Sequence, residues 1–338
     1  MCDTRVARCQ VVRCQVTRCQ VSGAELFDGN RLAFACPVCR ARLARESSDI
    51  LRCPNDAAAY TRVDGIWRFL SPQRALAFAQ FAREYEAVRR DEGRGSVDAA
   101  YYRSLPFDDV SGRFADLWRI RARSFRALVE QVVQPLEQAR RRPLTILDLG
   151  AGNGWLSYRL AQRGHSVAAI DLLVNSTDGL GAHVHYDAAF VPVQAEFDCL
   201  PCDAHQADLV VFDGSLHYSL DYETTLGEAM RVLRGDGRLA ILDSPTYREA
   251  ASGEWMAQER EARWMRRHGF RSNALLHENY LTYARLDDLA ARLRLCWQVT
   301  HPSFGWRWAV RRSWARWRAR REPARFPLIV GKHAEARA

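Results

Sequence analysis

The sequence predicts an α/β fold whose central strands are buried on both faces, and three observations lead to this prediction. Residues 145–149 and 166–170 are short apolar runs, the pattern of strands that are covered on both sides. The segment between them combines a glycine-rich turn with a helical pattern over 155–163, which Gly164 is placed to end. Further apolar runs follow at 190–193, 208–212 and 239–243, with a helical pattern at 224–233 between the last two. At 338 residues the chain can hold one such domain together with additional segments.

The turn after the first strand has glycines at positions 150, 152 and 154, which indicate a closely bound ligand. Glycine lets the backbone turn tightly and approach a ligand without a side-chain clash. Asp171 ends the second strand, where an acid can accept hydrogen bonds from both hydroxyls of a ribose. A nicotinamide dehydrogenase would want G-x-G-x-x-G, whereas the spacing here is G-x-G-x-G. Asp148, two residues before the first glycine, would repel a pyrophosphate but suits a cationic amino-acid ligand.

The run Asp148-Leu-Gly-Ala-Gly-Asn-Gly154, together with Asp171, resembles motif I of the class I S-adenosylmethionine-dependent methyltransferases. The resemblance implies a Rossmann-like, seven-stranded sheet that is mostly parallel, with its last strand antiparallel and helices on both faces. It also implies S-adenosyl-L-methionine as the cofactor, with its amino-acid end at the glycine turn and its ribose at Asp171. The residues that the resemblance assigns to the cofactor are Asp148, Gly150, Ala151, Gly152, Asn153, Gly154, Asp171, Leu172, Glu196, Phe197 and Asp213.

Downstream segments extend this resemblance to about residues 143–333, in the motif order of the family. Residues 195–201 are similar to the family stretch G-D-A-E-x-L-P, in which an acid accepts from the adenine amino group. Glu196 stands where Asp is usual, and Phe197 packs there or offers its backbone N–H. Residues 231–241 resemble the stretch that the family usually writes R-V-L-x-P-G-G, and we expect a turn at 234–237. Cys199 and Cys202 form a C-x-x-C pair that we interpret as buried thiols, because no partner pair lies nearby.

The loop at residues 213–218 follows the fourth strand and is expected beside the donor methyl group. In open α/β sheets, ligands lie at the carboxyl ends of the strands. If the acceptor is a hydroxyl group it needs a base, and His217 is the best-placed candidate, with a pKa suited to neutral pH. Tyr218 is a second candidate catalytic residue. An alternative role for His217 is to cap the loop without taking part in the reaction.

The segment 31–70 has the cysteine spacing of a small zinc ribbon, with Cys36-Pro-Val-Cys39 followed by Cys53-Pro-Asn-Asp56. It is similar to zinc ribbons that precede methyltransferase domains in several families, where the fourth ligand is Cys or His. Three thiolates and one carboxylate are an uncommon zinc site. The module therefore either holds a weakened zinc site or persists as a packing module without metal.

Residues 1–30 contain Arg-Cys-Gln at 8–10, 13–15 and 18–20. We interpret this segment as a disordered extension or as the product of a start codon assigned too early. A thiol-rich metal-binding tail is the alternative.

Residues 71–142 are predicted to form a helical cap or linker, with helices over 75–90 and 114–138 and an aromatic patch at 101–107. Ser71 and Pro72 predict the start of the first helix. Five side chains of this region could line a cleft above the cofactor, or form a solvated charged face instead: Glu84, Tyr85, Arg89, Glu92 and Arg94.

Residues 143–338 are predicted to form the methyltransferase domain, with inserted helices at about 247–280 and 305–321. Within the first of these segments the helix is expected at 254–268. The domain is expected to continue with a helix at 286–295 and strands at 296–300 and 326–330. The segment 305–321 has four tryptophans among seven arginines. It could lie on an anionic membrane surface, clamp RNA by stacking and charge, or pack on its own domain.

Composition limits the partners and the compartment. The net charge of +9 invites a nucleic-acid or membrane interpretation, but the basic residues are almost all arginine, with Lys332 the single lysine, and this bias can reflect base composition. The N-terminus lacks the apolar core of a signal peptide, and no apolar run reaches the ~20 residues that span a bilayer. The ten cysteines are scattered, which indicates a reducing environment. We therefore expect a cytoplasmic enzyme. We expect a small-molecule or lipid-linked acceptor. The alternatives are an RNA methyltransferase and a non-catalytic cofactor-binding protein.

Overall fold

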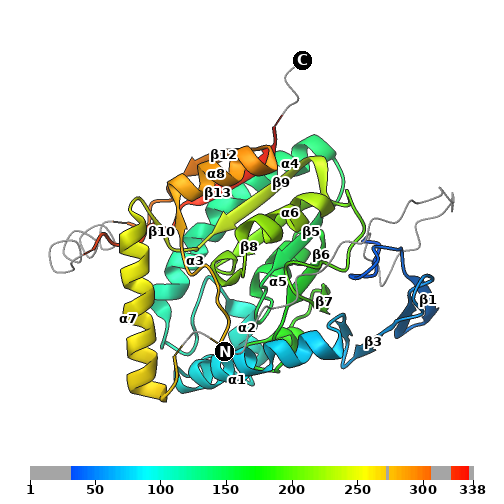
Figure 1. Ribbon diagram of the computed structural model, residues 1–338, viewed down its shortest axis with the longest axis horizontal. Helices are drawn as coiled ribbons and strands as arrows, with labels where there is room; N and C mark the ends of the chain where they lie inside the picture. Colours follow the sequence, from blue (N-terminus) through cyan, green and yellow to red (C-terminus); the bar gives the residue numbers. More distant parts are fainter. Residues whose placement is uncertain (1–31, 272–273, 306–320, 335–338) are drawn as a thin grey trace, which may run out of the picture.

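The computed structural model describes residues 32–271, 274–305 and 321–334. Within these ranges one sheet of eleven strands forms the centre of the molecule, in the order β1-β2-β3-β4-β7-β6-β5-β8-β9-β13-β12 (Figure 1). Its strands are β1 (Ala44–Ser47), β2 (Ile50–Arg52), β3 (Ala59–Val63), β4 (Ile66–Arg68), β5 (Thr145–Leu149), β6 (Ser166–Asp171), β7 (Val191–Gln194), β8 (Ala207–Asp213), β9 (Leu233–Leu242), β12 (Leu295–Thr300) and β13 (Leu328–His333). A two-stranded parallel pair joins β10 (Thr246–Tyr247) to β11 (Leu281–Thr282).

The seven strands from β7 to β12 in this order confirm the predicted class I sheet. β7, β6, β5, β8 and β9 pair in parallel. β13, the last strand along the chain, runs antiparallel to both of its neighbours, β9 and β12. Every residue of β5 and β8 is buried, which is why these strands appear in the sequence as apolar runs without a polar alternation.

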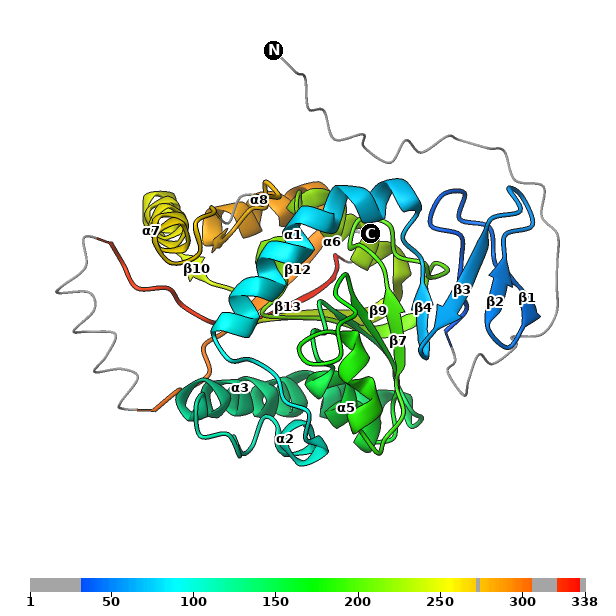
Figure 2. The same ribbon diagram turned by 90° about the horizontal axis from the view of Figure 1, so that it is seen from below.

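Helices cover both faces of the sheet (Figure 2). One face is covered by α3 (Ala115–Leu128), α4 (Gln134–Arg140) and α5 (Trp155–Gln162), whose buried residues form one apolar cluster with β5, β8 and β9. The other face is covered by α6 (Tyr222–Val232) and α8 (Tyr283–Leu293), which form a second cluster with the same strands. The remaining helical elements are α1 (Pro72–Asp91), α2 (Ala99–Ser104), α7 (Ala250–His268), the π-helical turn η1 (Val129–Val133) and the 3-10 turns η2 (Leu180–His185) and η3 (Leu216–Tyr218).

The N-terminal module is continuous with the central sheet. β4 pairs in parallel with β7, with Trp67 opposite Val193. The Trp67 side chain is fully buried and its ring lies beside that of Phe34, 6.0 Å between centroids. The backbone N–H of Ala35 also donates to the carbonyl of Pro201 at 3.1 Å. Residues 32–69 therefore extend the sheet beyond β7, and Ser71 then caps α1, its side chain accepting from the N–H of Arg74 at 3.2 Å.

Three elements differ from the sequence predictions. The turn expected at 234–237 is a bulge inside β9, because Leu233 pairs with Ala207 and Arg238 resumes the pairing at Leu209. The helix expected over 114–138 is divided by η1, which precedes Pro135 in the first turn of α4; proline lacks the N–H that a regular helix would use there. The aromatic patch around Tyr101 and Tyr102 is the helix α2, with both rings buried.

The predicted extension at 1–30 lies outside the described residues, as does nearly all of the segment 305–321. Among the helices that the structure does describe, none combines the length and apolar character needed to cross a membrane.

Candidate active site

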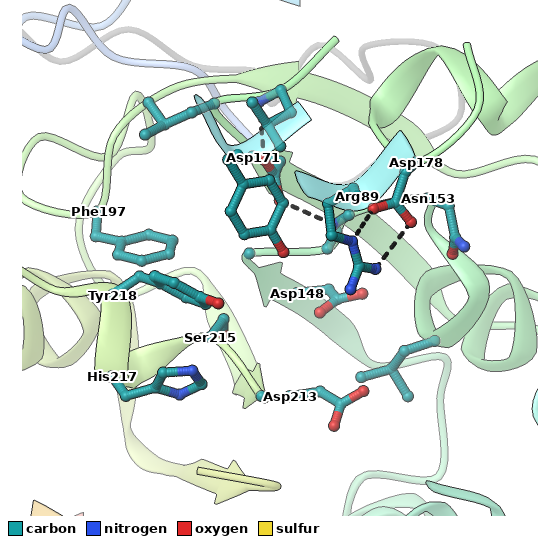
Figure 3. Close-up of a pocket in the computed structure, with 18 of the residues that line it drawn as sticks. Arg89, Asp148, Asn153, Asp171, Asp178, Phe197, Asp213, Ser215, His217 and Tyr218 are labelled. Carbon is teal, nitrogen blue, oxygen red and sulfur yellow. Dashed lines mark hydrogen bonds and ion pairs between the residues drawn. The ribbon is translucent and has the colours of Figure 1, made fainter. Parts of the chain in front are cut away.

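The carboxyl ends of β5, β6, β8 and β9 meet at a cavity of about 270 Å³ (Figure 3). Helices α1 and α3 supply further walls. Of the cofactor and catalytic residues predicted from the sequence, the following line this cavity: Asp148, Gly150, Ala151, Gly152, Asn153, Asp171, Leu172, Glu196, Phe197, Asp213, His217 and Tyr218. Gly154 is not among the lining residues. Gly154 is the N-cap of α5, with a φ of 83°. A Cβ at this position would lie 2.7 Å from the ring of Phe190, so the role of Gly154 is in packing.

The glycine turn lies tightly against the loop after β8. Gly150 has a φ of +77°, and a Cβ there would lie 2.2 Å from the Cβ of Ser215. Ser215 in turn donates its hydroxyl to the carbonyl of Leu149. Only glycine allows this contact, which places the loop at 213–218 directly beside the turn at 150–154.

Asp171, at the end of β6, is fixed by two backbone donors. Its Oδ2 accepts from the N–H of Gly152 and its Oδ1 from the N–H of Leu173, each at 2.8 Å. Burial raises the pKa of Asp171 to about 6, although these N–H groups oppose the shift. The carboxylate orientation is therefore set before any ligand binds.

Asp148 is the most deeply buried acid of the cavity, with 1% of its surface exposed. Its Oδ2 accepts from the hydroxyl of Ser157 at 2.7 Å, and its Oδ1 has no hydrogen-bond partner in the described part of the chain. Burial raises the pKa of Asp148 to about 7, and the charge of Asp171 adds to this. A cationic group in the cavity would favour the ionised form.

Asp213 ends β8, and Asp243 follows the last residue of the neighbouring strand β9. Asp213 Oδ2 accepts from Arg121 Nη1 at 3.2 Å, and Asp243 Oδ1 accepts from the Ser124 hydroxyl at 2.6 Å. Both donors come from α3. Burial raises the pKa of Asp213 well above its usual range, Arg121 opposes this, and the neighbouring carboxylates of Asp243 and Asp148 add to it.

Helix α1 forms one wall of the cavity through Phe78, Phe81, Tyr85 and Arg89. Arg89 forms a two-pronged ion pair with the buried Asp178, with Nη2 to Oδ1 at 3.0 Å (Figure 3). Nearer the start of the helix, Arg74 pairs in the same way with Glu196, with Nε to Oε1 at 2.8 Å. Helix α1 is thus attached to the loops after β6 and β7, on either side of the cavity.

The cleft predicted for the helical cap is present only in part. Tyr85, Arg89 and Arg94 line the cavity, whereas Glu84 and Glu92 do not. Phe78, Phe81, Tyr85 and Arg89 share one helical face through their spacing of three or four residues, a signal that could have separated them from Glu84. Sequence reasoning missed Arg121, Asp178, Ser215 and Asp243, because no local pattern connects them with the glycine turn.

The predicted adenine residues lie in different surroundings from one another. The ring of Phe197 reaches the glycine turn, 3.3 Å from where a Cβ of Gly150 would be. Glu196 is already paired with Arg74. Asp198, which was not predicted, also lines the cavity, and burial raises its pKa to about 6.

His217 differs from its predicted chemistry. Its ring lies in the cavity wall beside Tyr218, with 4.4 Å between ring centroids. Burial lowers the pKa of His217 to about 3, and the positive charges of Arg260, His277 and Arg121 contribute to the shift. The imidazole is therefore neutral at pH 7 and a weaker base than the expected pKa near neutrality implied.

Comparisons with known proteins agree with this geometry. A family model described as a methyltransferase domain matches residues 147–241. An uncharacterized methyltransferase of Mycobacterium tuberculosis is 30% identical over 180 residues, which cover 47% of this chain and 67% of that protein. The chain is a class I S-adenosylmethionine-dependent methyltransferase.

Other methyltransferases are similar over part or most of the chain. The malonyl-[acyl-carrier protein] O-methyltransferase of Hahella chejuensis is 33% identical over 99 residues, covering 29% of this methyltransferase and 35% of that protein. The solved structure of the 1,6-didemethyltoxoflavin-N1-methyltransferase of Burkholderia thailandensis is 16% identical, with a TM-score of 0.42. The match covers 87% of this chain and 99% of that one.

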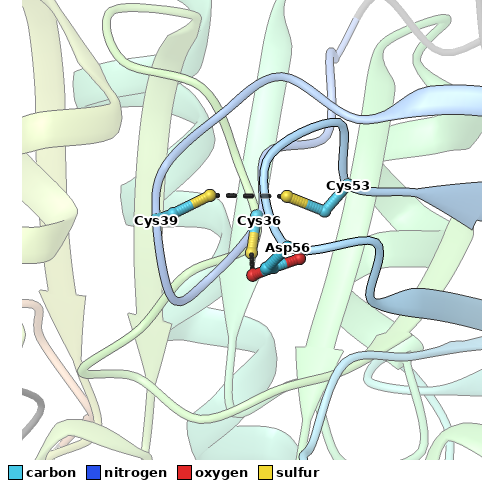
Figure 4. Close-up of side chains that lie close together, drawn as sticks. All are labelled: Cys36, Cys39, Cys53 and Asp56. Atoms are coloured by element: carbon cyan, nitrogen blue, oxygen red, sulfur yellow. Dashed lines mark hydrogen bonds between the residues drawn. The ribbon is translucent and has the colours of Figure 1, made fainter.

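The four predicted metal ligands of this methyltransferase lie together in the N-terminal module (Figure 4). One ligand atom from each of Cys36, Cys39, Cys53 and Asp56 lies within 4.8 Å of all the others. Cys39 Sγ and Cys53 Sγ are 3.4 Å apart, and Cys36 Sγ is 3.5 Å from Asp56 Oδ2. By contrast, Cys199 and Cys202 are buried and form no disulfide, in line with the predicted buried thiols.

Proposed function

We propose that this methyltransferase acts on a small-molecule acceptor that binds beneath α1, in the cavity at the ends of the strands. The observation that supports this is the lining of the cavity. Seven lining side chains are carboxylic acids and three are arginines, an excess of four acids. Such a lining offers a phosphate few cationic partners, and this disfavours RNA or a phosphate-linked lipid as the group that enters the cavity.

The residues at the glycine turn fit S-adenosylmethionine. We propose that Asp171 accepts from the ribose hydroxyls, and that Asp148 and the turn at 150–153 hold the amino-acid end. The unpartnered Oδ1 of Asp148 is an acceptor suited to an ammonium group. Leu172, Phe197 and the Glu196–Arg74 pair would border the adenine. When bound, the cofactor supplies a methyl group on a positively charged sulfur.

The protein's part in the reaction is then to position the acceptor and to exclude water. The contact of Gly150 with Ser215 keeps the loop at 213–218 beside the turn. Phe81, Tyr85 and Tyr218 form an aromatic wall of the cavity. Holding a nucleophile in line with the methyl group can supply up to ~7–11 kcal/mol of the barrier reduction. The neutral imidazole of His217 would accept a hydrogen bond from the acceptor rather than carry a full charge.

Calorimetry tests the cofactor site. S-adenosylhomocysteine should bind and NADH should not, and the reverse result would overturn the assignment of the site. Asp171→Ala should weaken binding by about 1–3 kcal/mol, because the ligand's hydroxyl groups lose a buried acceptor. Asp116→Ala is the matched control, because Asp116 is exposed on α3 and pairs with Arg119 on the same helix.

The acceptor class is tested by an untargeted comparison of methylated metabolites, lipids and RNA in cells with and without the gene. A small molecule that loses its methylated form supports the proposal. A methylated nucleotide in RNA, or a lipid-linked intermediate, that disappears instead would contradict it.

We further propose that Cys36, Cys39, Cys53 and Asp56 hold one zinc ion in the N-terminal module. Zinc–sulfur bonds of about 2.3 Å in a tetrahedral site place sulfur atoms ~3.8 Å apart. The Cys39–Cys53 Sγ separation of 3.4 Å is close to this value. The separation of 3.5 Å between Cys36 Sγ and Asp56 Oδ2 is close to the ~3.6 Å expected for a sulfur and a carboxylate oxygen on one zinc ion. The metal would have a structural role, because the cluster does not belong to the lining of the cavity.

A further inference from the structure

The carboxylic acids of the cavity are only partly neutralised by the arginines around it. Arg89 pairs with Asp178 and Arg74 with Glu196. Asp171 is held by backbone N–H groups, and the proposed function assigns Asp148 to the cofactor. Asp198 accepts from the hydroxyl of Thr225. Asp213, which the family resemblance assigns to the cofactor, and Asp243 remain. Arg121 donates to one oxygen of Asp213, and the Ser124 hydroxyl donates to one oxygen of Asp243.

These two acids form a pair at the carboxyl ends of adjacent parallel strands, with Asp213 buried and Asp243 half-buried. Asp213 lies opposite Leu242 in the register of β8 and β9, so Asp243 is one residue further along. Only 7% of the Asp213 surface is exposed. Asp213 Oδ1 and Asp243 Oδ2 are both buried, and within the ranges that the structure describes neither receives a hydrogen bond from a third residue. The two carboxyl groups contact each other, and both residues line the cavity.

Aromatic rings form a second wall of the same cavity. Tyr218 lies edge-to-face with Tyr85, with 5.7 Å between ring centroids, and Phe81 is 6.2 Å from Tyr218. His277 lies edge-to-face with Tyr218 at 5.5 Å. A small extension of about 10 Å³ continues between α1 and α7 and shares Phe81, Tyr85 and Tyr218 with the main cavity.

The two histidines near this wall do not add positive charge at neutral pH. Burial and nearby positive charges lower the pKa of His217 to about 3 and that of His277 to about 4. Carboxylates opposite aromatic rings are the combination that binds an organic ammonium group, through charge-assisted hydrogen bonds and cation–π attraction.

We propose that the acceptor is a basic amine, whose ammonium group binds between the Asp213–Asp243 pair and the aromatic wall of Phe81, Tyr85 and Tyr218. This inference rests on the proposed function and names its substrate class. In the reaction, the ammonium first gives one proton to the carboxyl pair. The nitrogen lone pair then forms the N–C bond as the methyl–sulfur bond breaks, and the electrons of that bond remain on sulfur. The product leaves as the protonated N-methylamine.

The test compares amines with alcohols of the same carbon skeleton. Ethylamine, butylamine and 2-phenylethylamine, each with its matching alcohol, are titrated at pH 7.5 into the full-length protein saturated with S-adenosylhomocysteine. We expect at least one amine to bind tenfold or more tightly than its alcohol. A net positive protein would otherwise repel the ammonium, so a preference of this size has to arise inside the cavity.

Two variants test whether the preference for amines over alcohols depends on Asp243. Asp243→Asn should reduce the amine-to-alcohol ratio by tenfold or more, whereas Asp116→Asn, on the exposed side of α3, should leave it unchanged. Three outcomes would each overturn the inference. The alcohols could bind as tightly as the amines, none of the six compounds could bind, or the amine-to-alcohol affinity ratio could be unchanged in a folded Asp243→Asn protein. Failure of S-adenosylhomocysteine itself to bind would instead contradict the proposed cofactor site. Thermal melting shows whether each variant is folded, and the comparison on the unmodified protein does not depend on any variant.

Discussion

At the scale of single residues, Gly150 and Gly164 share a left-handed backbone but differ in their surroundings. Gly150 has a φ of +77° and Gly164 a φ of +87°. A Cβ at Gly150 would collide with Ser215, whereas nothing lies within 4 Å of a Cβ at Gly164. Substituting each glycine by alanine therefore separates two losses of stability: the loss caused by the left-handed backbone, which both share, and the loss caused by the contact with Ser215, which only Gly150 has.

Gly164→Ala should cost about 1–2 kcal/mol of unfolding free energy, the penalty for an L-residue in this conformation. Gly150→Ala should cost clearly more and should also abolish S-adenosylhomocysteine binding, because the loop at 213–218 has to move away from the turn. Denaturant unfolding and calorimetry measure the two effects. Equal losses in both variants would mean that the Gly150–Ser215 contact has no consequence of its own.

Asp148 should make cofactor affinity depend on pH. An acid with a folded pKa of about 7 keeps a proton at pH values where the unfolded chain, with an ordinary pKa near 3.9, has lost it. Its contribution therefore lowers stability as the pH rises from about 4 to 7, and a cationic ligand must displace this proton.

S-adenosylmethionine should therefore bind more tightly as the pH rises from 5.5 to 7.5, by up to about tenfold per pH unit below the pKa. Asp171, whose pKa is about 6, also loses its proton in the lower part of this pH range. Asp148→Asn should make the slope less steep, while Asp116→Asn should leave it as in the unmodified protein. Isothermal titration in a series of buffers measures the slope, and an unchanged slope in Asp148→Asn would contradict the assigned titration.

At the scale of elements, α1 depends on its two arginine attachments. Arg89 reaches Asp178, whose side chain is 11% exposed, and Arg74 reaches Glu196 with the same exposure. Removing either arginine leaves a largely buried carboxylate without its cation. Arg83 lies on the same helix but is exposed, so it provides a control of the same residue type.

Arg89→Ala should lower the unfolding free energy by about 1–3 kcal/mol, and it should weaken S-adenosylhomocysteine binding because α1 no longer holds its place over the cavity. Arg83→Ala should change stability by less than about 0.5 kcal/mol. Urea unfolding and calorimetry measure both. If the two variants behave alike, the ion pair does not position the helix.

Elements whose pattern is local could be predicted from the sequence, and those set by distant contacts could not. The segment from 145 to 171 carries its own strand, turn and helix signals, and it appears in the structure almost residue for residue. The bulge in β9 depends on its pairing with β8, which nothing in the sequence around residues 234–237 reveals. In the site, Asp148 and Asp171 belong to one local motif, whereas Arg74 and Glu196 are 122 residues apart and meet only after folding.

At the scale of the whole molecule, the N-terminal module and the cavity are connected through one strand. β4 of the module pairs with β7, and Glu196 lies two residues after the end of β7. The chain passes from β4 into α1 within four residues. Unfolding of the module would therefore disturb the positions of Glu196 and α1 at the cavity.

Protein purified without added zinc should contain about one zinc ion per chain, measured by metal analysis. Cys39→Ser should reduce this content, whereas Cys296→Ser should not, because Cys296 is an exposed free cysteine on β12. Asp56→Cys should raise the affinity, since a thiolate replaces a harder oxygen ligand. A metal-free protein that is nevertheless fully folded would contradict the zinc site.

The pairing of β4 with β7 also protects the molecule from self-association. In the core sheet alone, β7 would be an edge strand, with a row of backbone N–H and C=O groups open to pairing with another chain. β4 covers part of this edge, and the buried ring of Trp67 holds it there. A chain in which the module has unfolded would thus present a ready template for strand addition. Unfolding of the module would therefore expose the molecule to aggregation as well as disturb the cavity.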